Sequence, residues 1–343
     1  MTIIKHAGVI AWLVGIAIVI ALVIWSGIGP IAQAIASVGW GILLVLAVRI
    51  GTVSVAGAGW QLLFPAHNHP GLGTCVLVRF IREATNALLP LMQVGGDLIG
   101  ARLIMFRGIA GPLAAASIIV DILIQAVTQF LFACLGVATL VALGASDGLA
   151  RTITSALAVA ALLLIGFYVA QRSAGQRLLQ WIMNALTGDR QWRVLGTIDA
   201  VYEQLATIYA NRRRLFLSSF VHMIGWLAGV AEVLIVFAWM GHSIGLGEAI
   251  VIESLLHAVR GAAFAIPGAL GAQEGGLVLL CALFGIPPEQ AIALSLVKRV
   301  PDVVLGVPSL LAWQIMEWQR LQASRSSAEE LSQEASDRRS RDP

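Results

Sequence analysis

Six long apolar stretches constrain the fold of this 343-residue chain more than any other feature. A helix needs ~20 apolar residues to cross a bilayer. Only 12% of the residues are charged, whereas a soluble domain carries roughly 25%. Because backbone in lipid must satisfy its own hydrogen bonds, these stretches predict an all-α, polytopic helical membrane protein. They cover about 7–27, 41–64, 111–143, 152–170, 215–240 and 289–318.

Two further apolar segments, about 71–107 and 248–286, are interrupted by proline, glycine and charged residues. Each is too interrupted for one clean span but long enough for two half-crossing helices. Proline ends a helix because it lacks the backbone donor. Such irregular backbone survives at membrane depth only against protein or a wet cavity. We therefore predict two re-entrant helical hairpins that turn at Pro90 and Pro267.

The two interrupted segments are also related in sequence. Alignment of Pro90 with Pro267 pairs their other landmarks without a gap: Asp97 with Glu274, Gly108 with Gly285, Ile109 with Ile286, and Asp121 with Lys298. A duplicated, charge-bearing, broken element indicates a transport pathway at a repeat interface. We expect one transmembrane domain over 1–318, with repeats at about 7–143 and 152–318.

The distribution of arginine predicts the orientation in the membrane. The 171–214 loop holds seven arginines and the tail from 319 five, whereas the connections 28–39 and 241–247 hold no Lys or Arg. The positive-inside rule then places both termini and the 171–214 loop in the cytoplasm. With six spans, the hairpins must enter from opposite sides, which makes the repeat inverted.

Two cytoplasmic segments complete this organisation. Residues of about 194–211 have an apolar helical face opposite Asp199 and Glu203, which predicts an amphipathic helix. It either lies on the inner membrane surface or packs against other cytoplasmic segments. The polar tail of 319–343 has few apolar residues and is expected to be disordered.

Charged residues inside the apolar segments are the candidate functional groups, since each costs ~2.5–3.5 kcal/mol at a helix centre. Arginine forks suit phosphate, so we assign binding of an anionic or hydroxylated head group to Arg49, Arg82 and Arg260. A structural role is the alternative for the remaining charged residues. Helix N-termini stabilise carboxylates, and Arg79 could pair with Glu83, or Asp121 with Lys298. Cavity or coupling roles are assigned to Asp97, Asp121, Glu232, Glu274 and Lys298.

Several kinds of chemistry have no signal in this sequence. It has no zinc-protease motif, nucleophile elbow, P-loop or dinucleotide fingerprint. Cys75, Cys134 and Cys281 lie in apolar segments without metal-like spacing. We therefore expect no catalytic residue, metal, cofactor or nucleic-acid partner. Nothing in the pattern indicates an oligomeric state.

Two motifs resemble a known family over about residues 8–318. They are Arg82…Leu89-Pro90…Gly96-Asp97…Arg102 and the stretch Ile266-Pro-Gly-Ala-Leu-Gly-Ala-Gln-Glu-Gly275. The sequence resembles the lysylphosphatidylglycerol synthase transmembrane-region family, the flippase-like domain proteins. Within it, the chain looks most like the members associated with hopanoid biosynthesis. Asp97 stands where glutamate is common in the family.

The resemblance implies a bacterial inner-membrane protein that moves a lipid, such as a hopanoid or a phospholipid, between leaflets. No aminoacyl-transferase domain follows the last span, so aminoacyl-lipid synthesis is not expected. One alternative is a membrane-embedded enzyme of hopanoid or isoprenoid lipid biosynthesis that uses the buried carboxylates as acid and base. Another is an accessory scaffold for lipid-biosynthesis proteins.

Overall fold

A computed structural model describes residues 28–66, 68–89, 95–144, 147–170, 198–264, 266–320 and 322. Throughout these ranges the chain forms helices and turns, with no β-strand. The expected first span, the hairpin turn at Pro90, the start of the 194–211 segment and most of the tail lie outside them.

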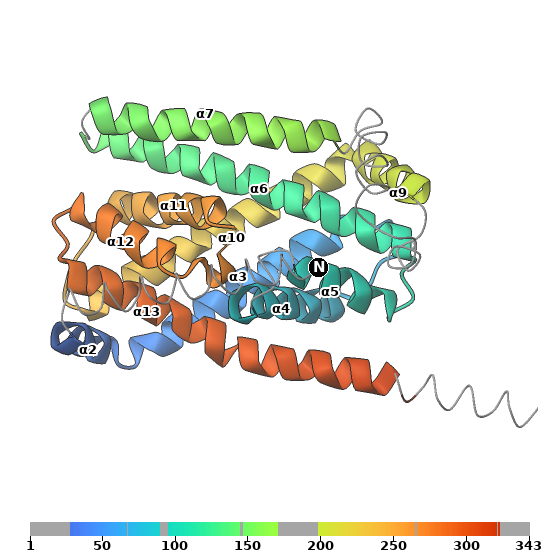
Figure 1. The fold of residues 1–343 in the computed structure, drawn as a ribbon, viewed down its shortest axis with the longest axis horizontal. Coiled ribbons are helices and arrows are strands. Elements are labelled where there is room, and N and C mark those ends of the chain that lie inside the picture. Colours follow the sequence, from blue (N-terminus) through green and yellow to red (C-terminus); the bar gives the residue numbers. More distant parts are fainter. Residues whose placement is uncertain are drawn as a thin grey trace, which may run out of the picture.

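The helices run in an elongated bundle (Figure 1). Three of them, α3, α6 and α10, are long and apolar enough to cross a membrane, which supports the prediction of a helical membrane protein. The six-span arrangement and its orientation stay predictions.

The elements are α2 (Ile28–Val38), α3 (Gly41–Gln61), α4 (Leu72–Leu88), α5 (Gly95–Met105), α6 (Gly111–Ala142), α7 (Asp147–Ala170), α9 (Ile198–Ala210), α10 (Arg212–Trp239), α11 (Leu246–Ala262), the 3₁₀ turn η2 (Pro267–Ala269), α12 (Ala272–Ala282) and α13 (Pro288–Val304). Residues 306–320, after α13, are also helical.

Two short helical pairs lie among the long helices. The pair α4–α5 extends toward one end of the bundle and α11–α12 toward the other, and they meet near the middle (Figure 1). Their ends touch through backbone: a Cβ added at Gly268, whose φ is +62°, would lie 2.9 Å from the carbonyl oxygen of Ala87. Glycine allows both this left-handed conformation and this approach.

Helix boundaries follow the spacing of the two related sequence segments. When the sequence is aligned on itself so that Pro90 lies on Pro267, both ends of α5 coincide with both ends of α12. The first residue of α6 then coincides with the first residue of α13. The same alignment brings α4 within one helical turn of α11. The sequence correspondence thus extends to where helices begin and end.

Apolar packing divides into two clusters of buried side chains. One includes Phe237, Leu256 and Leu294, and the other includes Trp60 and Leu103. Helix α6 contributes to both. The clusters hold the two pairs of short helices against the long ones, which fixes the positions of the charges these pairs carry.

Helix α9 covers most of the described part of the 194–211 segment. Leu205 and Ile208 are buried in the apolar cluster that includes Trp60, and Asp199 lies on the other side of the helix. Helix α9 packs against α6 and α10, so protein covers these two apolar side chains. Whether α9 lies on the inner membrane surface or packs against other cytoplasmic segments stays a prediction.

Candidate functional site

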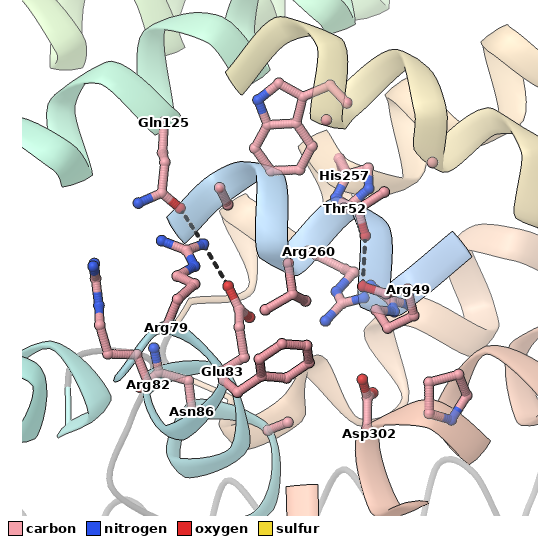
Figure 2. Close-up of a pocket in the computed structure, with 18 of the residues that line it drawn as sticks. Arg49, Thr52, Arg79, Arg82, Glu83, Asn86, Gln125, His257, Arg260 and Asp302 are labelled. Atoms are coloured by element: carbon pink, nitrogen blue, oxygen red, sulfur yellow. Dashed lines mark hydrogen bonds and ion pairs between the residues drawn. The ribbon is translucent and has the colours of Figure 1, made fainter. Parts of the chain in front are cut away.

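A polar cavity of about 340 Å³ lies where the two pairs of short helices meet. Residues of α3, α4, α5, α6, α10, α11 and α13 line it, so both halves of the chain contribute. In Figure 2, Arg49, Arg260, Glu83 and Asp302 converge on this space from four different helices. All three arginines predicted to bind substrate line the cavity, as do Asp97 and Glu232. Asp121, Glu274 and Lys298 are buried behind its wall.

Asp121, fully buried on α6, is the centre of the first ion cluster. Its Oδ2 lies 2.8 Å from Arg82 Nη1 and 3.3 Å from Arg79 Nη1. Arg82 also donates to Asp97 Oδ1 through Nε (2.9 Å) and Nη2 (2.6 Å). Arg79 pairs with Glu83, as the sequence predicted. Shared partners of this kind offset the cost of burying charge.

Glycines let α5 approach α4 closely enough to form this cluster. A Cβ at Gly96 would lie 2.2 Å from the carbonyl oxygen of Arg82, and one at Gly100 would lie 2.7 Å from the Arg82 side chain. The guanidinium also lies 5.0 Å from the centre of the Trp60 ring, within cation–π range. Arg82 is therefore held on all sides and is only 2% exposed.

Lys298, on α13, is the centre of the second ion cluster. Its Nζ lies 2.7 Å from Glu232 Oε2 and 2.9 Å and 3.0 Å from the two oxygens of Glu253. Arg49 reaches Glu232 at 3.2 Å, and His257 reaches Glu253 at 3.2 Å. Two cations thus balance two carboxylates here when His257 is neutral.

Glu274 has the structural role that its place at a helix start allows. It accepts from the Gly271 backbone at 2.7 Å, a capping-box bond at the N-terminus of α12. Its other oxygen accepts from Arg299 (2.7 Å) and Ser295 (2.9 Å). Arg299 also donates to the Gly268 carbonyl, so Glu274 and Arg299 fix the turn of the α11–α12 pair. Glu274 is fully buried and is not among the residues that line the cavity, and its predicted coupling role stays a prediction.

Asp121 and Lys298 do not pair with each other, contrary to the alternative weighed for them. Each binds partners from its own surroundings, with opposite sign: an acid among arginines and an amine among glutamates. Two correspondingly placed buried charges therefore each carry a local cluster.

Arg260 and Asp302 are the exceptions among the charges around the cavity. Both line it, and neither forms a hydrogen bond or ion pair with another described residue. A guanidinium left unpaired in a bundle interior can donate paired hydrogen bonds to an anionic or hydroxylated group. An unpaired carboxylate can accept from hydroxyl or ammonium groups.

The sequence reasoning assigned no site role to His222, Glu253, His257 or Asp302. His222, on α10, lies beside Asp121, and Asp302 enters the cavity from α13. Glu253 and His257 share one helical face at four-residue spacing, and that spacing was the available signal for their contact. His222 gave no such signal because its partner is distant in sequence. In the described ranges no three His, Cys, Asp or Glu side chains are placed to hold a metal.

Comparison with known proteins agrees with this architecture. Residues 12–308 match the family described as Lysylphosphatidylglycerol synthase TM region. The chain belongs to this family. It is also similar to a UPF0104 membrane protein of Methanothermobacter thermautotrophicus (strain Delta H), with 22% identity over 315 residues, 86% of this chain and 91% of the relative. No solved structure matches.

Proposed function

We propose that this protein is a lipid translocase that moves a hopanoid or a phospholipid between the leaflets of a bacterial inner membrane, with both termini in the cytoplasm. The observation that carries the proposal is the cavity between the two pairs of short helices. Arg260 lies in its wall and has no ion pair with any residue that the structure describes. Opposite helix directions and matching boundaries in the two halves support an inverted repeat, the architecture that places transport sites at the repeat interface.

The volume of the cavity indicates which part of a lipid enters it. About 340 Å³ is at the low end of small-ligand sites, which span about 300–1,000 Å³. A head group fits this volume, and the hydrocarbon chains stay in the bilayer. Exposed apolar side chains on the outer helices, such as Leu131 and Phe220, are suited to lipid contact.

Arg260, aided by Arg49, holds the anionic or hydroxylated group in this mechanism. Arg49 keeps a bond to Glu232 and is 18% exposed on its side chain. Arg82 is held by Asp97 and Asp121, so it shapes the site and orients its neighbours. Asp302 and Glu83 accept from hydroxyl or ammonium groups of the lipid.

The test is reconstitution of the full chain in liposomes with fluorescent lipids, followed by a leaflet-accessibility assay. Wild type is expected to accelerate exchange. Arg260→Gln removes a charge-assisted hydrogen bond worth about 1.5–3 kcal/mol, so exchange slows about ten- to hundredfold. Arg102→Gln is the matched control, because Arg102 pairs with Glu317 at the surface. Exchange equal in protein-containing and empty liposomes would refute the proposal, and covalently altered lipid would favour an enzyme.

A further inference from the structure

His222 has an acceptor at each of its two ring nitrogens. Nδ1 lies 2.9 Å from the Ser218 carbonyl oxygen, and Nε2 lies 3.3 Å from Asp121 Oδ1. A carbonyl oxygen can only accept, so Nδ1 carries a hydrogen. A neutral ring would then turn the lone pair of Nε2 toward a carboxylate. Both Nε2 and Oδ1 are buried, and neither forms a hydrogen bond with another described residue.

Charges in the first ion cluster are compatible with a positive charge at His222. Arg79 and Arg82 supply two positive charges to its ion pairs, while Glu83, Asp97 and Asp121 supply three negative ones. Arg49 and Arg260 also attract Glu83, so the count by itself does not require another cation. An imidazolium at His222 gives Nε2 a hydrogen to donate to Asp121.

We propose that His222 and Asp121 form a proton-binding site, in which the imidazole is held doubly protonated between Asp121 and the Ser218 carbonyl. The ring lines the cavity yet is only 3% exposed, so the proton is exchanged through the cavity. Asp121 of α6 faces the ring directly, and Arg79 and Arg82 of α4 pair with Asp121. Those arginines also pair with Glu83 of α4 and Asp97 of α5.

Helix α3 fixes the ring in this position. A Cβ at Gly59 would lie 2.4 Å from the Cε1 atom of His222, so only glycine leaves room for the ring. The Ser218 hydroxyl donates to the Gly59 carbonyl at 2.8 Å, which joins α10 to α3. The orientation of the imidazole is thus determined by packing as well as by its two acceptors.

His257 provides a natural comparison within the same cavity. Its Nε2 donates to Glu253 at 3.2 Å, and a neutral ring with its hydrogen on Nε2 satisfies that contact. The cluster around Lys298 is already balanced without it. The two histidines therefore differ in the number of hydrogens that their contacts need.

Resting on the proposed translocase function, the site couples lipid movement to protons. Release of the proton removes the positive charge that faces Asp121 and weakens the contact of α10 with α6 next to the cavity. With one proton per lipid, a gradient of one pH unit is worth about 1.4 kcal/mol and shifts the leaflet ratio up to about tenfold.

The first experiment reads the proton directly in the full chain, in lipid nanodiscs with ¹⁵N-labelled histidine. The chain has six histidines. The usual pKa of histidine is about 6.5, so an ordinary histidine is mostly neutral at about pH 7.5. We expect one imidazolium signal at that pH, absent from His222→Gln and retained in His257→Gln. A neutral signal assigned to His222, or an imidazolium that survives in His222→Gln, overturns the proton site.

The second experiment measures the leaflet ratio of a fluorescent phospholipid in proteoliposomes with and without an imposed pH gradient. Wild type is expected to shift the ratio with the gradient, and His222→Gln to lose that response. Exchange that ignores the gradient in wild type overturns the coupling. If wild type moves no lipid at all, the proposed function fails, and the nanodisc measurement still decides the proton site.

Discussion

Replacement of Lys298 by methionine tests whether the second ion cluster is a balanced buried unit. The ammonium group is 1% exposed on its side chain and satisfies Glu232 and Glu253 at 2.7–3.0 Å. Without the ammonium group, Arg49 is the one cation paired with these two buried carboxylates. A neutral His257 ring satisfies its contact with Glu253, so His257 supplies no second positive charge. Removal of one partner from a buried ionic group costs about 3–5 kcal/mol, so Lys298→Met is expected to lower the free energy of unfolding by that amount.

The assay is reversible unfolding of the purified chain in mixed micelles by added denaturing detergent. The matched control is Arg102→Met, which breaks an ion pair whose arginine side chain is 52% exposed and is expected to cost under about 1 kcal/mol. The double variant Lys298→Met, Glu253→Gln leaves Arg49 and Glu232 balanced and should recover most of the loss. A single variant as stable as the control, or a double variant no better than the single, would refute the reasoning.

Three further substitutions test other parts of the structure. Gly59→Ala places a Cβ 2.4 Å from the His222 ring. This overpacking should lower the free energy of unfolding by about 1–3 kcal/mol in the same unfolding assay. The histidine spectrum of the variant should also lose its imidazolium signal. Glu274→Gln can keep the capping bond, because glutamine also serves at that position, but it weakens the contact with Arg299. We expect the free energy of unfolding to fall by about 1–2 kcal/mol and translocation to persist. Abolished translocation in a stably folded variant would contradict a structural role. Gly268→Ala should destabilise by about 1–3 kcal/mol, since it puts a side chain at a left-handed position, and wild-type stability would contradict the contact between the hairpin ends.

Local features of the fold were predictable because membrane helices carry strong sequence signals. Apolar length predicted the long helices, and α3, α6 and α10 have the length and composition to span a bilayer. Proline and glycine predicted the interruption at Pro267, where η2 and a left-handed Gly268 form the turn. Amphipathic spacing predicted a helix in the segment where α9 lies.

The candidate site was predicted as a set of residues but not as a set of contacts. Arg49, Arg82 and Arg260 do converge on one cavity. Which of them has no ion pair among the described residues was not predictable. Arg82 is occupied by carboxylates 15 and 39 residues away, and Arg260 has no such partner in those ranges. Pairing over such sequence distances depends on helix packing, which leaves no periodic signal.

The sequence by itself determined that this chain is helical and membrane-embedded, that it contains a broken element twice, and that charges accompany both copies. Those properties follow from composition and spacing, because lipid excludes unpaired backbone and penalises isolated charge. Tertiary structure alone decided how the charges are shared. It gave Asp121 two arginines and His222 and gave Lys298 two glutamates, and it left Arg260 at the cavity without an ion pair to another described residue. The reason is that the close approach of helices, at glycines such as Gly59 and Gly96, sets which side chains can reach each other.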